Sequence, residues 1–204
     1  MQAEPSHQQQ ELETRERILY AAYEEIHSLG FQAASLNKIL ASTNVSKGAL
    51  YHYFSTKLEL GYAVVDELLA IEIQNRWVQP LLEADDPVTA LTEIIMLSGK
   101  EITAEDIQCG CPLNNLAQEM APVDEGFRSR VEAIYQAWRE GTALALEHGK
   151  KTGAVKKDVD VNSVATMLVA SLEGCMGLAK NAQSKKVLFQ CGQSIIDYLD
   201  SLKA

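Results

Sequence analysis

The sequence is poor in proline, glycine and cysteine, and each shortage argues against a class of protein. Its 204 residues include five prolines and twelve glycines, too few for a loop-rich or all-β fold. Four cysteines at irregular spacing do not form a disulfide scaffold, so reduced thiols are expected. No apolar run approaches the length of a membrane span, and the polar, acidic start does not resemble a signal peptide. These features predict a soluble, cytoplasmic protein with no membrane partner.

Acidic residues are missing from one window of an otherwise acidic chain. The chain carries 28 Asp and Glu against 18 Lys and Arg, a net charge of −10. Between Ile26 and Leu58 there is no carboxylate, but there are three lysines, Lys38, Lys47 and Lys57. A net charge of −10 would repel DNA, so any binding must come from a local patch. A patch kept free of carboxylates is typical of a surface that binds a polyanion.

Apolar residues spaced three and four apart, bounded by capping residues, predict helices along nearly the whole chain. The expected helices span residues 11–29, 35–41, 47–53, 57–79, 86–103, 112–120, 122–148, 160–182 and 184–202. Residues 1–10 are expected to be a disordered tail and residues 104–110 a loop, and Pro80 is expected to end the helix before it. No segment has the pattern of a strand. The predicted fold class is all-α, with a small three-helix unit over residues 11–56 and a larger helical domain over residues 57–204.

The window without carboxylates has the pattern of a helix-turn-helix. Asn44 lies between its two short helices, where a tight turn needs a residue that tolerates positive φ. Ser46 is a suitable N-cap for the second helix. Leu50 and Phe54, four residues apart, are expected to face the core, which leaves Lys47 on the outer face.

The start of the next helix carries an unusual charge. Thr56 and Glu59 have the spacing of a capping box. Lys57, in the first turn, opposes the helix dipole. A bound anion would explain that lysine, since helix N-termini also bind phosphate through their N–H groups.

The stretch over residues 14–60 resembles the DNA-binding domain of the TetR family of transcriptional regulators. The matching positions are Thr14-Arg15, Ile18-Leu19, Ala21-Ala22, Gly30-Phe31, Ile39, Val45-Ser46, Gly48, Leu50-Tyr51, Tyr53-Phe54, Lys57 and Leu60. The chain departs from the family pattern at Ile26, Leu40, Asn44 and Tyr53, which bears on base preference. The resemblance implies a double-stranded DNA operator whose phosphates are contacted by Ser35, Lys47, Tyr51, Tyr53 and Lys57. It places Ser46, Gly48, Ala49 and His52 nearest to base edges.

The same resemblance implies that residues 57–204 form a ligand-binding and dimerisation domain. The last two helices of each subunit would build a homodimer interface, through Met167, Leu168, Leu172, Cys175, Leu188, Cys191, Ile195 and Leu199. Packing within one chain is the alternative role for these residues. A pocket for a small-molecule inducer would be lined by large side chains and one thiol, with Trp77, Met96, Cys111, Leu116, Met120, Phe127, Tyr135 and Trp138 as candidates. Ordinary core packing is the alternative for each.

Cys111 is the second residue of another stretch, residues 110–120, that resembles a segment found in many TetR regulators. It is predicted at a helix N-terminus, where the pKa of a thiol falls. One hypothesis makes Cys111 a sensor of electrophiles or oxidants, with Cys109 available to resolve an oxidised thiol. The other makes it a small buried residue that fixes the helix start.

An enzyme is the rival class. Glu24 and His27 form one Glu-x-x-His motif, but a helical di-metal site needs a second copy, and the sequence has none. We predict no catalytic residue, metal or cofactor. The sequence therefore predicts a DNA-binding transcriptional regulator, most simply a repressor that a small-molecule inducer releases from a palindromic operator.

Overall fold

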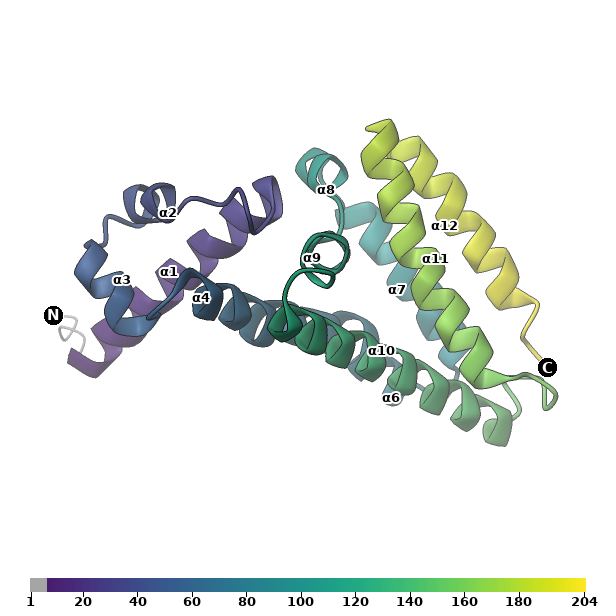
Figure 1. The fold of residues 1–204 in the computed structure, drawn as a ribbon. Helices are drawn as coiled ribbons and strands as arrows, with labels where there is room; N and C mark the ends of the chain where they lie inside the picture. Colours follow the sequence, from purple (N-terminus) through teal and green to yellow (C-terminus); the bar gives the residue numbers. More distant parts are fainter. Residues whose placement is uncertain (1–6) are drawn as a thin grey trace, which may run out of the picture.

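The computed structural model describes residues 7–204, and most of this range is helical (Figure 1). Its only β feature is an isolated bridge between Val155 and Lys203. The all-α prediction is confirmed.

Three helices form the N-terminal unit, α1 (His7–Leu29), α2 (Leu36–Thr43) and α3 (Lys47–Tyr53). Helix α1 begins within the predicted disordered tail, because the Gln- and Glu-rich segment before Thr14 consists of good helix formers. The remainder of that predicted tail, residues 1–6, lies outside the described residues. Ile18 is fully buried on the inner face of α1.

Local signals set the helix-turn-helix as predicted. Asn44 has a φ of 53° and ends α2 in the left-handed region. The Ser46 hydroxyl accepts a hydrogen bond from the Ala49 N–H at 3.1 Å, and Leu50 and Phe54 are buried. These caps fix the angle between α2 and α3.

The capping box at the next helix forms only in part. The Thr56 hydroxyl accepts from the Glu59 N–H at 3.0 Å. The Glu59 carboxylate reaches the N–H of Ser55, at 3.0 Å, in place of that of Thr56.

One continuous helical rod follows, made of α4 (Lys57–Val64), η1 (Val65–Leu69), α5 (Ala70–Ile73), η2 (Gln74–Val78) and α6 (Gln79–Leu82). The two η segments are π-helical. The helix end predicted at Pro80 is wrong. A proline removes only one N–H donor from a helix, and the wider π turn before Pro80 relieves the clash between its ring and the preceding carbonyl groups. The rod therefore continues past the proline to Leu82.

Six helices complete the body, α7 (Pro87–Glu101), α8 (Ala104–Cys109), α9 (Pro112–Met120), α10 (Glu125–Thr152), α11 (Val161–Ala182) and α12 (Lys185–Asp200). The loop predicted over residues 104–110 is mostly the helix α8. Thr103 and Asp106 start it with a reciprocal capping box, in which each side chain accepts from the other's backbone N–H.

Helix α10 runs the length of the body and packs against α11, α9, α7 and α6 (Figure 1). One buried cluster joins the N-terminal unit to α10 through the rings of Phe31 and Phe127, whose centroids lie 4.6 Å apart. A β-carbon at Gly61 would lie 2.5 Å from Phe31 and 2.7 Å from Phe127, so only glycine allows this approach. A second cluster fills the space between α7, α10, α11 and α12.

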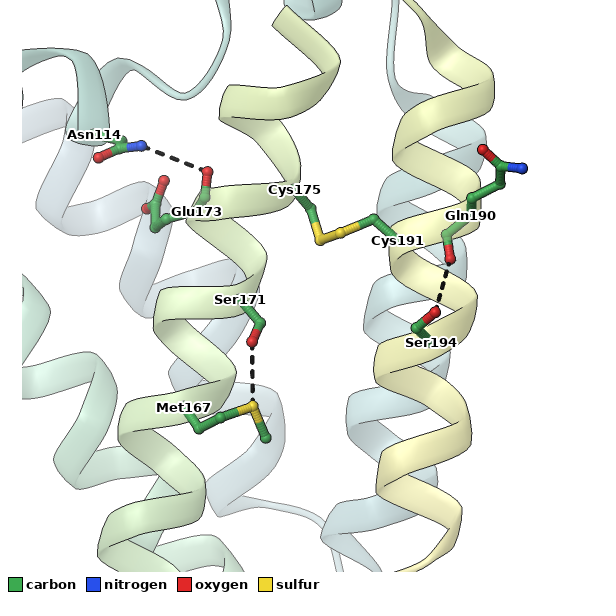
Figure 2. Close-up of a disulfide and its surroundings, with 8 residues drawn as sticks. All are labelled: Asn114, Met167, Ser171, Glu173, Cys175, Gln190, Cys191 and Ser194. Atoms are coloured by element: carbon green, nitrogen blue, oxygen red, sulfur yellow. Dashed lines mark hydrogen bonds between the residues drawn. A yellow bond between two sulfur atoms is a disulfide. The ribbon is translucent and has the colours of Figure 1, made fainter.

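A disulfide between Cys175 and Cys191 joins α11 to α12 (Figure 2). The expectation of reduced thiols is therefore wrong for these two cysteines, and Cys109 and Cys111 are free. The physical reason is the antiparallel pairing of α11 and α12, which brings positions at similar distances from the intervening turn face to face. Their α-carbons are 5.7 Å apart, within the range that a disulfide spans.

By length and hydropathy alone, α11 could cross a membrane, contrary to the expectation that no run is long enough. The helix instead packs against α10 and α12, and it carries the buried Glu173.

Candidate DNA interface and ligand cavity

The predicted base-reading residues lie along α3 and at its N-cap. Ser46, Lys47, Gly48 and His52 are exposed, as is Tyr51, while Ala49 is half-buried. The Lys47 ammonium lies 5.9 Å from the centre of the Tyr51 ring. The outer face of α3 is therefore available to a partner.

Of the other predicted phosphate contacts, Tyr53 and Lys57 are held by contacts within the protein, whereas the Ser35 hydroxyl is not. Ser35 stands at the N-cap position of α2, but its hydroxyl makes no capping bond. Tyr53 is half-buried against the core. Lys57 donates to the Gln32 carbonyl at 3.1 Å and lies over the Phe31 ring, and burial lowers the pKa of its ammonium. Lys57 thus already has a partner within the chain.

Two hydrogen-bonded contacts tie the N-terminal unit to α9 and to the turn that precedes it. The Glu119 carboxylate accepts from the N–H groups of Phe31 and Gln32, both at 2.8 Å. His27 Nε2 lies 2.7 Å from the Gly110 carbonyl oxygen. A carbonyl can only accept, so Nε2 carries the proton. These hydrogen bonds join α1 and the loop before α2 to the segment over residues 110–120.

A cavity of about 490 Å³ lies among α1, α5, α7, α11 and α12, a size suited to a small molecule. Four of the predicted pocket residues, Trp77, Met96, Cys111 and Trp138, lie on its wall. The rings of Trp77 and Trp138 are 5.2 Å apart and tilted by 38°. These two residues are the only tryptophans of the chain.

The other four predicted pocket residues lie elsewhere. Leu116, Met120 and Phe127 are buried in the cluster that joins the N-terminal unit to α10, and they do not line the cavity. Tyr135 also packs against that cluster, beside Glu173. The error arises because helical spacing identifies an inward face but not whether that face meets other side chains or a cavity.

Sequence reasoning missed several wall residues, among them Tyr23, His27 and Glu173. Tyr23 and His27 belong to α1, so the DNA-binding unit itself forms part of the wall. Glu173 did give a signal, since it is the only charged residue between Asp160 and Lys180 in an apolar helix. A lone charge on such a helix points to a buried polar site.

Glu173 is only half satisfied in its hydrogen bonding. Its Oε1 accepts from the Cys111 thiol at 3.4 Å, while its Oε2 is buried and has no partner among the described residues. Burial raises the pKa of Glu173 to about 7, against the opposing effects of Cys111 and Tyr135. Burial also raises the pKa of the Tyr135 hydroxyl.

Cys111 does not have the low thiol pKa that its position suggested. It is the N-cap residue of α9, as predicted. Burial and the nearby Glu173 carboxylate nevertheless raise the pKa of its thiol well above the ordinary value, and they outweigh the backbone N–H groups of the helix start. In this conformation Cys111 is a poor nucleophile.

Four of the predicted interface residues lie inside the protomer. The packing of α11 and α12 within one protomer already buries these four, namely Leu168, Cys175, Ile195 and Leu199. Met167, Leu172, Leu188 and Cys191 are half-buried. The exposed stripe of α11 instead carries small and apolar residues, namely Ala170, Gly174, Gly177 and Leu178. No described atom outside the helix lies within 4 Å of the β-carbon that a side chain would add at Gly174 or Gly177.

Among the side chains that the structure describes, those of residues 11–204, no group of three or more metal ligands occurs. A helix-turn-helix with an exposed second helix, carried on a helical body that contains a cavity, defines a DNA-binding transcriptional regulator.

Comparison with known proteins gives the family. Residues 18–64 match the model of the bacterial regulatory proteins of the tetR family. Residues 87–194 match that of the C-terminal domain of LmrA/YxaF-like transcriptional regulators. The chain belongs to the TetR family of transcriptional regulators.

Individual relatives support this assignment. The chain is 31% identical over 177 residues to an uncharacterized HTH-type transcriptional regulator in the lacX 3′ region of Lactococcus lactis subsp. lactis, covering 86% of this chain and 87% of that protein. It is 26% identical over 161 residues to the HTH-type transcriptional repressor DhaR of Mycobacterium sp. (strain GP1), covering 79% of each. A TetR transcriptional regulator from Chloroflexus aurantiacus J-10-FL has the same fold, with a TM-score of 0.82 at 24% identity, over 95% of this chain and 98% of that one.

Proposed function

We propose that the protein is a cytoplasmic repressor that binds a palindromic operator as a homodimer and leaves it when a small molecule fills the cavity. The observation that carries this proposal is the composition of the cavity wall. Tyr23 and His27 of the DNA-binding unit face the same space as Trp77 and Trp138 of the body. A ligand in that space therefore touches both units at once.

The His27 contact offers a route from the cavity to the DNA. His27 lines the cavity and donates to the Gly110 carbonyl in the turn between α8 and α9. A ligand that displaces either group loosens α1 from the body and changes the position of α3. Release then requires that the ligand bind the loosened conformation better than the DNA-bound one.

The proposed homodimer pairs the exposed stripe of α11, with its neighbour α12, against the same face of a second copy. Gly174 and Gly177 allow close backbone approach, and the Leu178 side chain is 60% exposed. In a two-fold symmetric dimer, the two α3 helices would bind operator half-sites whose centres lie about 34–36 Å apart, or a multiple of that distance. In each half-site, Ser46, Lys47, Gly48, Ala49 and His52 lie nearest the bases. Ser35, Tyr51, Tyr53 and Lys57 lie nearest the phosphates.

The test couples the two sites in one protein. An operator is selected from random duplex DNA, and compounds that quench the two cavity tryptophans are collected. A saturating compound should weaken operator affinity by roughly fivefold or more. His27→Ala should reduce that factor, whereas His148→Ala, at an exposed site on α10, should not. Compounds that fill the cavity of the wild type without changing operator affinity would refute the proposal.

A further inference from the structure

The cavity wall includes a buried carboxylate oxygen that makes no hydrogen bond to any described residue. Glu173 is 93% buried, lines the cavity and leaves its Oε2 in this state. Figure 2 shows its side chain on the opposite side of α11 from the disulfide, facing Asn114 and away from α12. An unsatisfied buried acceptor in a protein is costly, and a bound donor can remove that cost.

No described residue makes a geometric hydrogen bond to Oε2, although the Tyr135 hydroxyl lies close enough to the carboxyl group to lower its pKa. Cys111 donates to Oε1 through a weak S–H donor, and the Asn114 amide reaches only the backbone carbonyl of Glu173. The free oxygen is therefore open to a group that a ligand brings.

The charges around the cavity favour a positive group. The wall carries four carboxylates, Glu72, Glu101, Asp106 and Glu173, against Arg76, Lys100 and the ring of His27. Arg76 is paired with Glu101 at 3.5 Å. Burial, followed by the charges of Glu72 and Asp106, raises the pKa of the Tyr23 hydroxyl to about 12, as expected where negative charge is in excess. An anionic ligand would meet repulsion here.

The rest of the wall is apolar and aromatic. Trp77, Trp138 and Phe189 supply ring faces, and Met96 and Met176 supply adaptable thioethers. Such a surface binds a hydrophobic body, and ring faces attract a cation nearby.

We propose that the ligand is an arylalkylamine cation, whose protonated nitrogen donates to Glu173 Oε2 while its aromatic body packs against Trp77 and Trp138. This assignment rests on the proposed ligand-binding function and names the chemistry of that same cavity. No part of it requires Cys111 to react.

Three matched probes test the assignment, namely 2-naphthylmethylamine, 2-naphthylmethanol and 2-naphthoic acid. They share one ring system and differ in the polar group. Binding is measured by titration calorimetry and by quenching of the two cavity tryptophans at pH 8, where Glu173 is largely ionised and the amine is protonated. The amine should bind roughly tenfold or more tightly than the alcohol, and the acid should bind more weakly than either.

Two variants separate Glu173 from a general charge effect. Glu173→Gln keeps the shape and removes the charge, so the preference for amine over alcohol should fall to within about threefold. Glu140→Gln, at an exposed carboxylate on α10 outside the cavity wall, should leave the preference unchanged. Equal binding of amine and alcohol by the wild type, or an undiminished preference in Glu173→Gln, would overturn the assignment.

Operator affinity, measured in the same samples, keeps the two proposals apart. If the amine binds through Glu173 but does not change operator affinity, the assigned ligand class is supported and the proposed release mechanism is refuted. If another compound releases the DNA while the amine shows no preference, the release mechanism holds and the ligand class fails.

Discussion

Replacing Glu173 by glutamine should stabilise the protein at high pH and leave it nearly unchanged at low pH. Burial raises the pKa of this carboxyl from 4.5 in the unfolded chain to about 7 in the folded one. The folded state therefore holds the proton more tightly, and stability falls as the pH rises from 4.5 to 7. Above pH 7 the full cost is present, and below pH 4.5 there is none.

The size of the effect follows from the same two values. At about 1.4 kcal/mol for each pH unit, a rise from 4.5 to about 7 costs about 3 kcal/mol. Cys111 and Tyr135, which interact with Glu173, both have raised pKa values and stay neutral throughout this range. The titration of Glu173 is therefore not offset by a neighbour that gains charge.

Urea unfolding followed by circular dichroism at pH 5 and pH 8, at one protomer concentration, measures this difference. Glu173→Gln should gain about 3 kcal/mol over the wild type at pH 8, or about 6–12 °C in melting temperature, and little at pH 5. All other titrating groups are shared by the two proteins and cancel. If Glu173→Gln raises the free energy of unfolding equally at both pH values, or lowers it at pH 8, the argument that a buried, ionised Glu173 destabilises the protein is refuted.

Further predictions concern the DNA interface, the dimer and the thiols. Lys47→Ala should weaken operator binding and lower the slope of log affinity against log salt by about one for a lost phosphate contact, so an unchanged slope contradicts that role. Leu178→Glu should give a folded monomer in sedimentation, while Leu144→Glu, at a site on α10 that is 63% exposed, should remain a dimer. Cys111 should react with iodoacetamide far more slowly than a free cysteine, because its thiol pKa is raised; fast reaction coupled to DNA release would instead support thiol sensing. Reducing the disulfide, which closes a loop of 16 residues, should lower the free energy of unfolding by about 3 kcal/mol, and an unchanged urea midpoint would contradict this.

The helix-turn-helix was predictable because its signals are local. Asn44, Ser46 and Thr56 each act on backbone within three residues, so the sequence alone indicates the turn and the starts of α3 and α4. The helix end predicted at Pro80 was wrong, because no sequence pattern identifies the π turn that accommodates the proline. Thr103 began a helix in what seemed a loop, although its spacing to Asp106 was visible in the sequence.

The cavity was less predictable, because its position depends on where the inward-facing side chains of neighbouring helices leave space between them. Trp138 and Phe127 lie on the same helix α10 and both point inward, yet one lines the cavity and the other meets Phe31. The disulfide could have been inferred, since Cys175 lies eight residues before Gln183 and Cys191 seven after Ser184, on two helices that were both predicted.

The contribution of α1 to the cavity wall limits how this protein can be re-engineered. Chimeric regulators are designed by exchanging one DNA-reading head for another, with the junction in the loop before α4. Here that cut would replace Tyr23 and His27, so the hybrid would receive a new operator and a damaged sensor together. A graft of residues 31–56 alone would carry α2 and α3 and keep α1 with the body. Such a graft must still offer backbone N–H groups to Glu119 and a carbonyl to Lys57 in the loop between α1 and α2. The boundary between the helices that face the DNA and those that line the cavity therefore lies at the end of α1, two helices earlier than the loop before α4.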